Sequence, residues 1–187
     1  MIFEKLILKN WISYKDVNHI EFSTNKNKKI TLIRGVNKGG KTSILRALKW
    51  VLYEFTGDVN QFKKPFELLN REAKRNGEYK LQVTLHIKKD NDKIEITRSL
   101  QPRTGVSRPN NNDFEHFLGI KKNGSTITQD NEKYIKALLP SEIHSFFLFD
   151  GEKLQDYNDL VLQTDSSTDL KGQIEKVIQT PYLKSAA

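Results

Sequence analysis

A glycine-rich segment that ends in lysine and threonine is the part of this chain best suited to chemistry. Residues 35–42 read Gly-Val-Asn-Lys-Gly-Gly-Lys-Thr and match the pattern G-x-x-x-x-G-K-[ST] of phosphate-binding loops (P-loops). Glycines allow such a loop to bring backbone N–H groups close to phosphate oxygens. Lys41 supplies a mobile positive charge for the β- and γ-phosphates, and the Thr42 hydroxyl is the expected Mg²⁺ ligand. The predicted contacts with a nucleoside triphosphate are Gly35, Asn37, Lys38, Gly39, Gly40, Lys41, Thr42 and Ser43.

The flanking sequence has the pattern that a P-loop needs on both sides. An apolar run at 30–34 predicts a buried strand before the loop. Apolar residues spaced as one helical face predict a helix over 42–55 that ends near Gly57. Two earlier strands are expected at 2–8 and 19–22. This strand–loop–helix order turns the pattern match into a predicted site.

The rest of the chain predicts fewer regular elements. Residues 58–76 are charged and irregular. Alternating apolar residues from 79 to 100, interrupted by a turn at 90–92, predict a β-hairpin. Residues 102–112 are polar and predict a loop, and 131–139 predict a short helix that ends at a proline.

Composition limits the class of protein and favours an anionic partner. The chain has 187 residues, 36% of them hydrophobic, which is enough for one sizeable domain. It contains no cysteine, so disulfides, thiolate catalysis and cysteine-based zinc sites are excluded. The charged N-terminus does not resemble a signal peptide, and no apolar stretch approaches the roughly 20 residues of a membrane helix, so we expect a cytoplasmic protein. The net charge of +8 favours nucleic acid as a partner.

Near the end of the chain, a short apolar run that predicts a strand is followed directly by acidic residues. Residues 146–149 read Phe-Phe-Leu-Phe and are followed by Asp150, Gly151 and Glu152. In one interpretation this is the Walker B strand, with Asp150 on Mg²⁺. In the other it is the loop to a helical subdomain in ABC-type ATPases, where a polar residue contacts the metal and the attacking water. Walker B usually has Glu directly after Asp, so Gly151 favours the second interpretation.

Three segments together resemble SMC-like ATPases. These segments are Lys-Asn-Trp-Ile-Ser-Tyr at 9–14, the P-loop at 35–42 and the Asp-Gly-Glu segment at 146–152, which is similar to that of the DndD group associated with DNA phosphorothioation. The resemblance implies an α/β P-loop NTPase fold, the N-terminal lobe of an ABC-ATPase head, with a mixed sheet and an antiparallel β-hairpin subdomain. It implies a lobe over residues 1–157, followed at 158–187 by a linker and the start of a helical segment.

The resemblance also implies roles for residues outside the P-loop. Ser13 would lie near the nucleotide, and Asp150 would contact Mg²⁺ or the attacking water, so Lys41 and Asp150 are the expected catalytic residues. The implied activity is that of an ATPase: ATP binding would close two heads into a dimer on DNA, and ATP hydrolysis would reopen them. The implied setting is DNA modification, restriction or phage defence, with a nuclease or DNA-modification protein as partner. The residues placed where the family carries a basic surface facing DNA are Lys63, Lys64, Arg71, Lys74 and Arg75.

Two other functions remain open at this point. No Leu-Ser-Gly-Gly signature and no apolar strand ending in Asp-Glu occurs, so we expect the catalytic glutamate in a further part of a larger ATPase. Alternatively, the chain is an ATP-sensing regulatory module that recruits a nuclease without turnover. A third interpretation is a self-contained small P-loop NTPase with Asp150 as Walker B.

Overall fold

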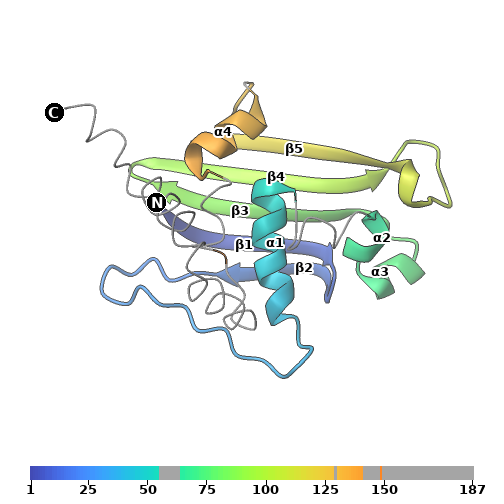
Figure 1. The fold of residues 1–187 in the computed structure, drawn as a ribbon, viewed down its shortest axis with the longest axis horizontal. Coiled ribbons are helices and arrows are strands. Elements are labelled where there is room, and N and C mark those ends of the chain that lie inside the picture. Colours follow the sequence, from blue (N-terminus) through green and yellow to red (C-terminus); the bar gives the residue numbers. More distant parts are fainter. Residues whose placement is uncertain (55–63, 129, 141–147, 149–187) are drawn as a thin grey trace, which may run out of the picture. The chain divides into compact units, whose positions relative to one another are not determined.

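A six-stranded antiparallel sheet is the central feature of the fold (Figure 1). The computed structural model describes residues 1–54, 64–128, 130–140 and 148. The strand order is β2-β1-β3-β4-β5-β6, and every pairing among the described residues is antiparallel. The strands are β1 (Ile2–Trp11), β2 (Tyr14–Glu21), β3 (Leu81–Lys89), β4 (Asp92–Pro102), β5 (Phe114–Lys122) and β6 (Ser125–Thr126).

The predicted hairpin is confirmed as β3 and β4, which form the middle of this sheet and not a separate subdomain. Leu85 pairs with Ile96, and Ile87 pairs with Ile94, so their apolar side chains share one face. Asp90 adopts a left-handed conformation, with φ 56°, in the tight turn between the strands. The expectation of a mixed sheet is wrong for the described residues.

One helix, α1 (Lys41–Tyr53), packs across β1, β3 and β4 and covers one face of the sheet (Figure 1). Its buried residues recur at helical spacing and include Ile44, Ala47 and Val51. The rings of Trp11 and Trp50 lie 5.0 Å apart between the sheet and the helix. The helix ends earlier than predicted, because Glu54 takes the left-handed conformation, with φ 62°, that usually ends a helix at glycine. Phe55 and Gly57 lie outside the described residues.

Several short elements were not predicted. Within the segment expected to be irregular, α2 (Pro65–Leu68) and α3 (Arg71–Arg75) form two short helices. Pro65 fixes the first turn of α2, and the Asn70 side chain caps α3 by accepting hydrogen bonds from two backbone N–H groups. Strand β5 lacks clean alternation and contains Gly119, which explains why its sequence does not predict a strand.

The strand predicted directly before the P-loop does not form. Residues 30–34 lie in an irregular, exposed segment, and no strand of the described residues pairs with them. A strand needs a neighbour for its backbone N–H and C=O groups, and this segment has none among the residues that the structure describes. Its apolar side chains are therefore open to solvent, with Ile30 86%, Leu32 70% and Ile33 39% exposed.

The chain divides into two compact units, Met1–Tyr134 and Ile135–Ala187. The predicted helix near residue 135 is confirmed as α4 (Asn131–Leu138), which crosses the boundary between the units. The short helix η1 (Asn111–Asp113) ends the predicted loop after β4. None of the helices that the structure describes is long and apolar enough to span a membrane.

Candidate nucleotide-binding site

The P-loop leads directly into the N-terminus of α1. Gly40 takes a left-handed conformation, with φ 92° and ψ 5°, and it precedes the helix without any side chain that caps it. The first turn of the helix therefore leaves backbone N–H groups free of a capping side chain, and it carries no acidic residue. Such a helix terminus attracts anions, because its free N–H groups can donate hydrogen bonds to them and the positive end of the helix dipole lies at the same place.

The Lys41 side chain folds back over the P-loop and contacts its first two residues. Its ammonium group donates hydrogen bonds to the carbonyl oxygens of Gly35, at 2.7 Å, and Val36, at 3.0 Å. The same side chain is exposed, so a phosphate that enters the loop reaches a positive charge already held at its edge. The structure thus brings together the first glycine and the lysine of the predicted motif.

The loop leaves no room for side chains at its last two glycines. A Cβ atom on Gly39 would lie 2.9 Å from the carbonyl oxygen of Val36. A Cβ atom on Gly40 would lie 3.1 Å from the Tyr14 ring, in a backbone conformation that side chains disfavour. Lys38 also has a positive φ, 65°, which costs a non-glycine residue about 1 kcal/mol.

Residues at the turn between β1 and β2 contact the end of the P-loop and the first turn of α1. The Trp11 indole N–H donates to the Ser43 carbonyl at 2.8 Å, and the hydroxyls of Ser13 and Ser43 lie 3.3 Å apart. The Tyr14 hydroxyl donates to the Gly40 carbonyl at 3.3 Å. Burial raises the pKa of Tyr14, which keeps this donor protonated well above neutral pH. Sequence reasoning placed Ser13 near the nucleotide, but it missed Tyr14.

The remaining predicted contacts differ in their surroundings. Asn37 is exposed, Thr42 is half-buried at the start of α1, and Ser43 is buried with its hydroxyl toward Ser13. Asp150 lies outside the described residues. Within the part of the chain that the structure describes, no group of three His, Cys, Asp or Glu side chains could hold a metal ion.

A groove of about 1010 Å³ lies beside the loop. Its walls include Ser13 and Lys38 on the P-loop side, and Phe66, Asn70 and Arg71 on the side of α2 and α3. The amide of Asn70 donates to the Ile12 carbonyl at 2.9 Å, which fixes α3 against the turn after β1. The short helices have no sequence signal strong enough to predict this groove.

The predicted DNA contacts lie along the same short helices and are mixed with acids. Arg71 and Arg75 line the groove, and Lys64 is exposed at the start of α2. The Lys74 ammonium lies 3.7 Å from the centre of the Phe66 ring. Lys63 lies outside the described residues.

Acidic side chains reduce the positive charge of that surface. Glu67 and Glu72 also line the groove, and Glu72 forms a 2.8 Å ion pair with Lys15. The hydrogen bond with Glu72 raises the pKa of Lys15.

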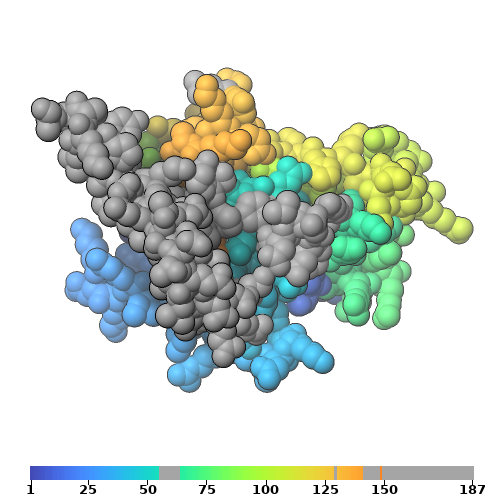
Figure 2. Space-filling view, in the orientation of Figure 1, coloured from blue at the N-terminus to red at the C-terminus, as the bar shows by residue number. Residues whose placement is uncertain are grey.

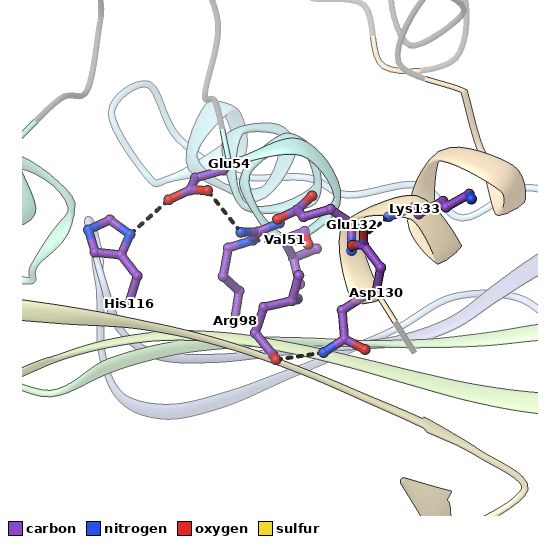
Figure 3. A network of polar contacts seen from close by, with 9 residues as sticks. Val51, Glu54, Arg98, His116, Asp130, Glu132 and Lys133 are labelled. Carbon is purple, nitrogen blue, oxygen red and sulfur yellow. Dashed lines mark hydrogen bonds and ion pairs between the residues drawn. The ribbon is translucent and has the colours of Figure 1, made fainter. Parts of the chain in front are cut away.

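The opposite end of α1 is fixed by a buried arginine that sequence reasoning missed (Figure 3). Arg98 of β4 is 3% exposed and pairs with Glu54 at 3.1 Å and with Glu132 of α4 at 2.9 Å. The second carboxylate oxygen of Glu54 lies 2.8 Å from Nδ1 of His116 on β5. These contacts tie the C-terminal end of the P-loop helix to two strands of the sheet.

Comparison with known proteins identifies the family. A family model described as an AAA domain matches residues 5–182. No curated protein matches the chain. Among solved structures, the SMC head domain from Thermotoga maritima is similar, with 25% identity, a TM-score of 0.42, and coverage of 74% of this chain and 41% of that chain. The chain therefore spans less than half of that domain. With its P-loop and a matched region that extends over nearly its whole length, the chain belongs to the AAA domain family.

Proposed function

We propose that this chain is the ATP-binding N-terminal lobe of an SMC-like ATPase that acts on DNA. The observation that carries the proposal is the P-loop itself, in which the Lys41 ammonium bridges the Gly35 and Val36 carbonyls at the open N-terminus of α1. Domains of the AAA family bind ATP with Mg²⁺, which is consistent with this geometry.

The residues of the loop fit the triphosphate and its metal. The free N–H groups at the start of α1 would hold phosphate oxygens, and Lys41 would neutralise the β- and γ-phosphates. Thr42 stands at the first turn, where its hydroxyl would hold Mg²⁺, with Asp150 as the second proposed ligand. When bound, Mg²⁺ would neutralise charge that develops on the transferred phosphoryl group.

The adjoining groove suits the nucleoside. It is continuous with the loop through Lys38 and Ser13, and it offers the Phe66 ring as an apolar surface. Its volume of about 1010 Å³ is ample for a base and a ribose. Ser13 would then contact the nucleotide at the junction between the phosphates and the nucleoside.

The segment before the P-loop supports the idea of a lobe that another part of an ATPase completes. Ile30 and Leu32 of this segment, and Val36 of the adjoining P-loop, are 70% to 86% exposed, a density of exposed apolar side chains that usually marks an interface. A strand from a partner lobe would satisfy the unpaired backbone of this segment and cover these side chains.

Within SMC-like ATPases, the proposed assignment to a DndD-like protein rests on the sequence resemblance. The segments at 9–14 and 146–152 favour a DndD-like protein in DNA modification, restriction or phage defence. In that role two heads would close on ATP and grip DNA, with a nuclease or a DNA-modification protein as partner. Residues 1–157 would form the lobe, and 158–187 would lead toward the remainder.

The test is ATP turnover by the 187-residue chain in saturating ATP and Mg²⁺, with binding followed in the same samples. The proposal predicts binding with negligible turnover, because the catalytic glutamate would lie in another part of the ATPase. Robust turnover that is lost in Asp150→Ala would instead identify a self-contained NTPase with Asp150 as Walker B. Turnover that stays absent when the proposed second lobe of the ATPase is added to this chain would favour an ATP-sensing module.

A further inference from the structure

The net positive charge of this chain is confined to one continuous segment. Residues 22–53 contain eight Lys and Arg residues and no Asp or Glu. The whole chain has 31 Lys and Arg against 23 Asp and Glu, so the rest of it holds 23 of each and is formally neutral. The entire net charge of +8 therefore lies in the segment that connects β2 to α1 and continues through that helix.

The first part of this segment is an ordered loop, residues 23–31, that we call the basic loop. Its two ends are joined because the Ser23 N–H donates to the Thr31 hydroxyl at 2.7 Å and the Ser23 hydroxyl donates to the Lys28 carbonyl. Asn25 forms a turn at the tip by accepting hydrogen bonds from the N–H groups of Asn27, at 2.8 Å, and Lys28, at 3.2 Å. These hydrogen bonds define the shape of the loop.

Three lysines of the basic loop point their charge into solvent. Lys26, Lys28 and Lys29 are exposed, and within the described residues no acidic side chain lies within ion-pair distance of them. In Figure 1 the blue segment that carries them extends away from the sheet, and in Figure 2 blue atoms of this part of the chain lie at the surface on the left of the view. By contrast, lysines at the far end of the sheet, such as Lys121 and Lys122, are paired with Glu95 and Asp92.

We propose that the basic loop binds the phosphate backbone of duplex DNA, through Lys26, Lys28 and Lys29. The proposal rests on the proposed function, and it assigns the DNA contact to a surface other than α2 and α3. Three exposed ammonium groups on one short loop, with no ion-pair partner among the described residues, present a concentrated positive charge to a polyanion, and each phosphate contact releases counterions. On α2 and α3, by comparison, Glu67 and Glu72 offset the basic side chains.

The chemistry of the loop favours DNA over an anionic membrane. The tip of the loop, from Ser23 to Lys29, carries only Ser, Thr, Asn and Lys side chains, and the exposed apolar side chains of Ile30 and Leu32 follow it on the side of the P-loop. The tip itself therefore offers no apolar group to insert among lipid chains. Asn and Ser side chains are common contacts to DNA phosphates and sugars. The loop is also joined to the P-loop by residues 32–34 alone, so DNA would bind next to the nucleotide site.

The experiment compares two charge-matched triple variants of the 187-residue chain. One carries Lys26→Gln, Lys28→Gln and Lys29→Gln. The control carries Lys88→Gln, Lys89→Gln and Lys93→Gln, three exposed lysines around the turn between β3 and β4. Affinity for a short DNA duplex is measured over a range of salt concentrations, together with affinity for ATP and for vesicles that contain anionic lipid.

We expect the basic-loop variant to lose roughly 10- to 100-fold in DNA affinity near 0.1 M salt, with the salt slope reduced by up to about 3, while the control loses less than about 3-fold. ATP affinity should be unchanged in both variants. Equal losses in the two variants, or binding to vesicles but not to DNA, would overturn the proposal. If the chain binds ATP but no DNA, DNA binding by the basic loop is refuted and the proposed ATPase function stands. If the chain binds DNA through the basic loop but does not bind ATP, the proposed ATPase function is refuted and DNA binding by the loop stands.

Discussion

The indole N–H of Trp11 donates a 2.8 Å hydrogen bond to the carbonyl of Ser43, which joins the end of β1 to the first turn of the P-loop helix. Both residues are buried, so the bond is shielded from water. The contact fixes the N-terminus of α1, and with it the P-loop, against the central sheet.

Trp11→Phe should therefore weaken both the fold and nucleotide binding. The variant keeps an aromatic ring near Trp50 but loses the hydrogen bond and part of the buried volume, which should cost about 1–3 kcal/mol of unfolding free energy. ATP affinity should fall by about 3- to 10-fold. Urea unfolding and ATP titration measure the two effects. Trp50→Phe is the control, because it perturbs the same ring pair without this bond; an equal loss of ATP affinity there would argue against a positioning role for the bond.

Two glycines of the P-loop should respond differently to the same substitution. Gly39→Ala places a Cβ 2.9 Å from the Val36 carbonyl oxygen, so the loop must shift, and ATP affinity should fall by about 10-fold or more. Gly35→Ala brings its Cβ no closer than 3.7 Å to the Lys41 side chain, an ordinary contact, and should lose less than about 3-fold. Calorimetric titration with ATP measures both. The reverse order of the two losses would mean that the loop binds nucleotide in another conformation.

Arg98→Ala should be among the more damaging substitutions far from the P-loop. It removes the partner of both Glu54 and Glu132 and opens a cavity beneath α1. Because both carboxylates remain partly exposed, the expected loss is about 2–3 kcal/mol, below the usual cost of breaking a fully buried pair. Lys121→Ala, which removes the more exposed ion pair with Glu95, should cost about 0–1 kcal/mol. Similar losses in urea unfolding would show that the Arg98 network adds little.

The edge of the sheet where β4 begins and β5 ends provides a pH-dependent observable, the pKa of Asp92. Hydrogen bonds from the Lys122 ammonium and the Asn123 amide lower the pKa of Asp92. A carboxyl whose pKa is lower in the folded state stabilises the fold above its unfolded pKa of about 3.9, and this contribution is lost as the pH falls through the folded pKa. Lys122→Gln should raise the Asp92 pKa toward its ordinary value in an NMR titration. Lys89→Gln should raise it less, because Lys89 acts only through its charge at a distance; an equal rise would mean that the hydrogen bond is not the main cause.

The local sequence predicted those elements whose partners lie nearby in the chain. The β3–β4 hairpin follows from alternation around one tight turn, and α1 follows from apolar spacing after the glycines of the loop. Lys41 and the two crowded glycines, Gly39 and Gly40, also follow from the motif, because a tight loop has few alternatives at these positions.

Other features depend on contacts that no local pattern records. Residues 30–34 have the composition of a strand, but they lack a neighbour in the described residues and stay irregular. The groove is built from α2 and α3, which are too short for periodicity to be visible. Arg98 looks like a polar strand residue until Glu54 and Glu132, distant in sequence, converge on it.

The most direct test of the account is ATP binding by Lys41→Ala compared with Lys38→Ala. Each substitution removes one positive charge from the same loop, but only Lys41 bridges the carbonyls of Gly35 and Val36. If this loop is the nucleotide site, Lys41→Ala should lower ATP affinity by about 100-fold or more, whereas Lys38→Ala should change it by less than about 5-fold. An unchanged affinity in Lys41→Ala, or equal losses in the two variants, would contradict the assignment of this loop as the nucleotide site.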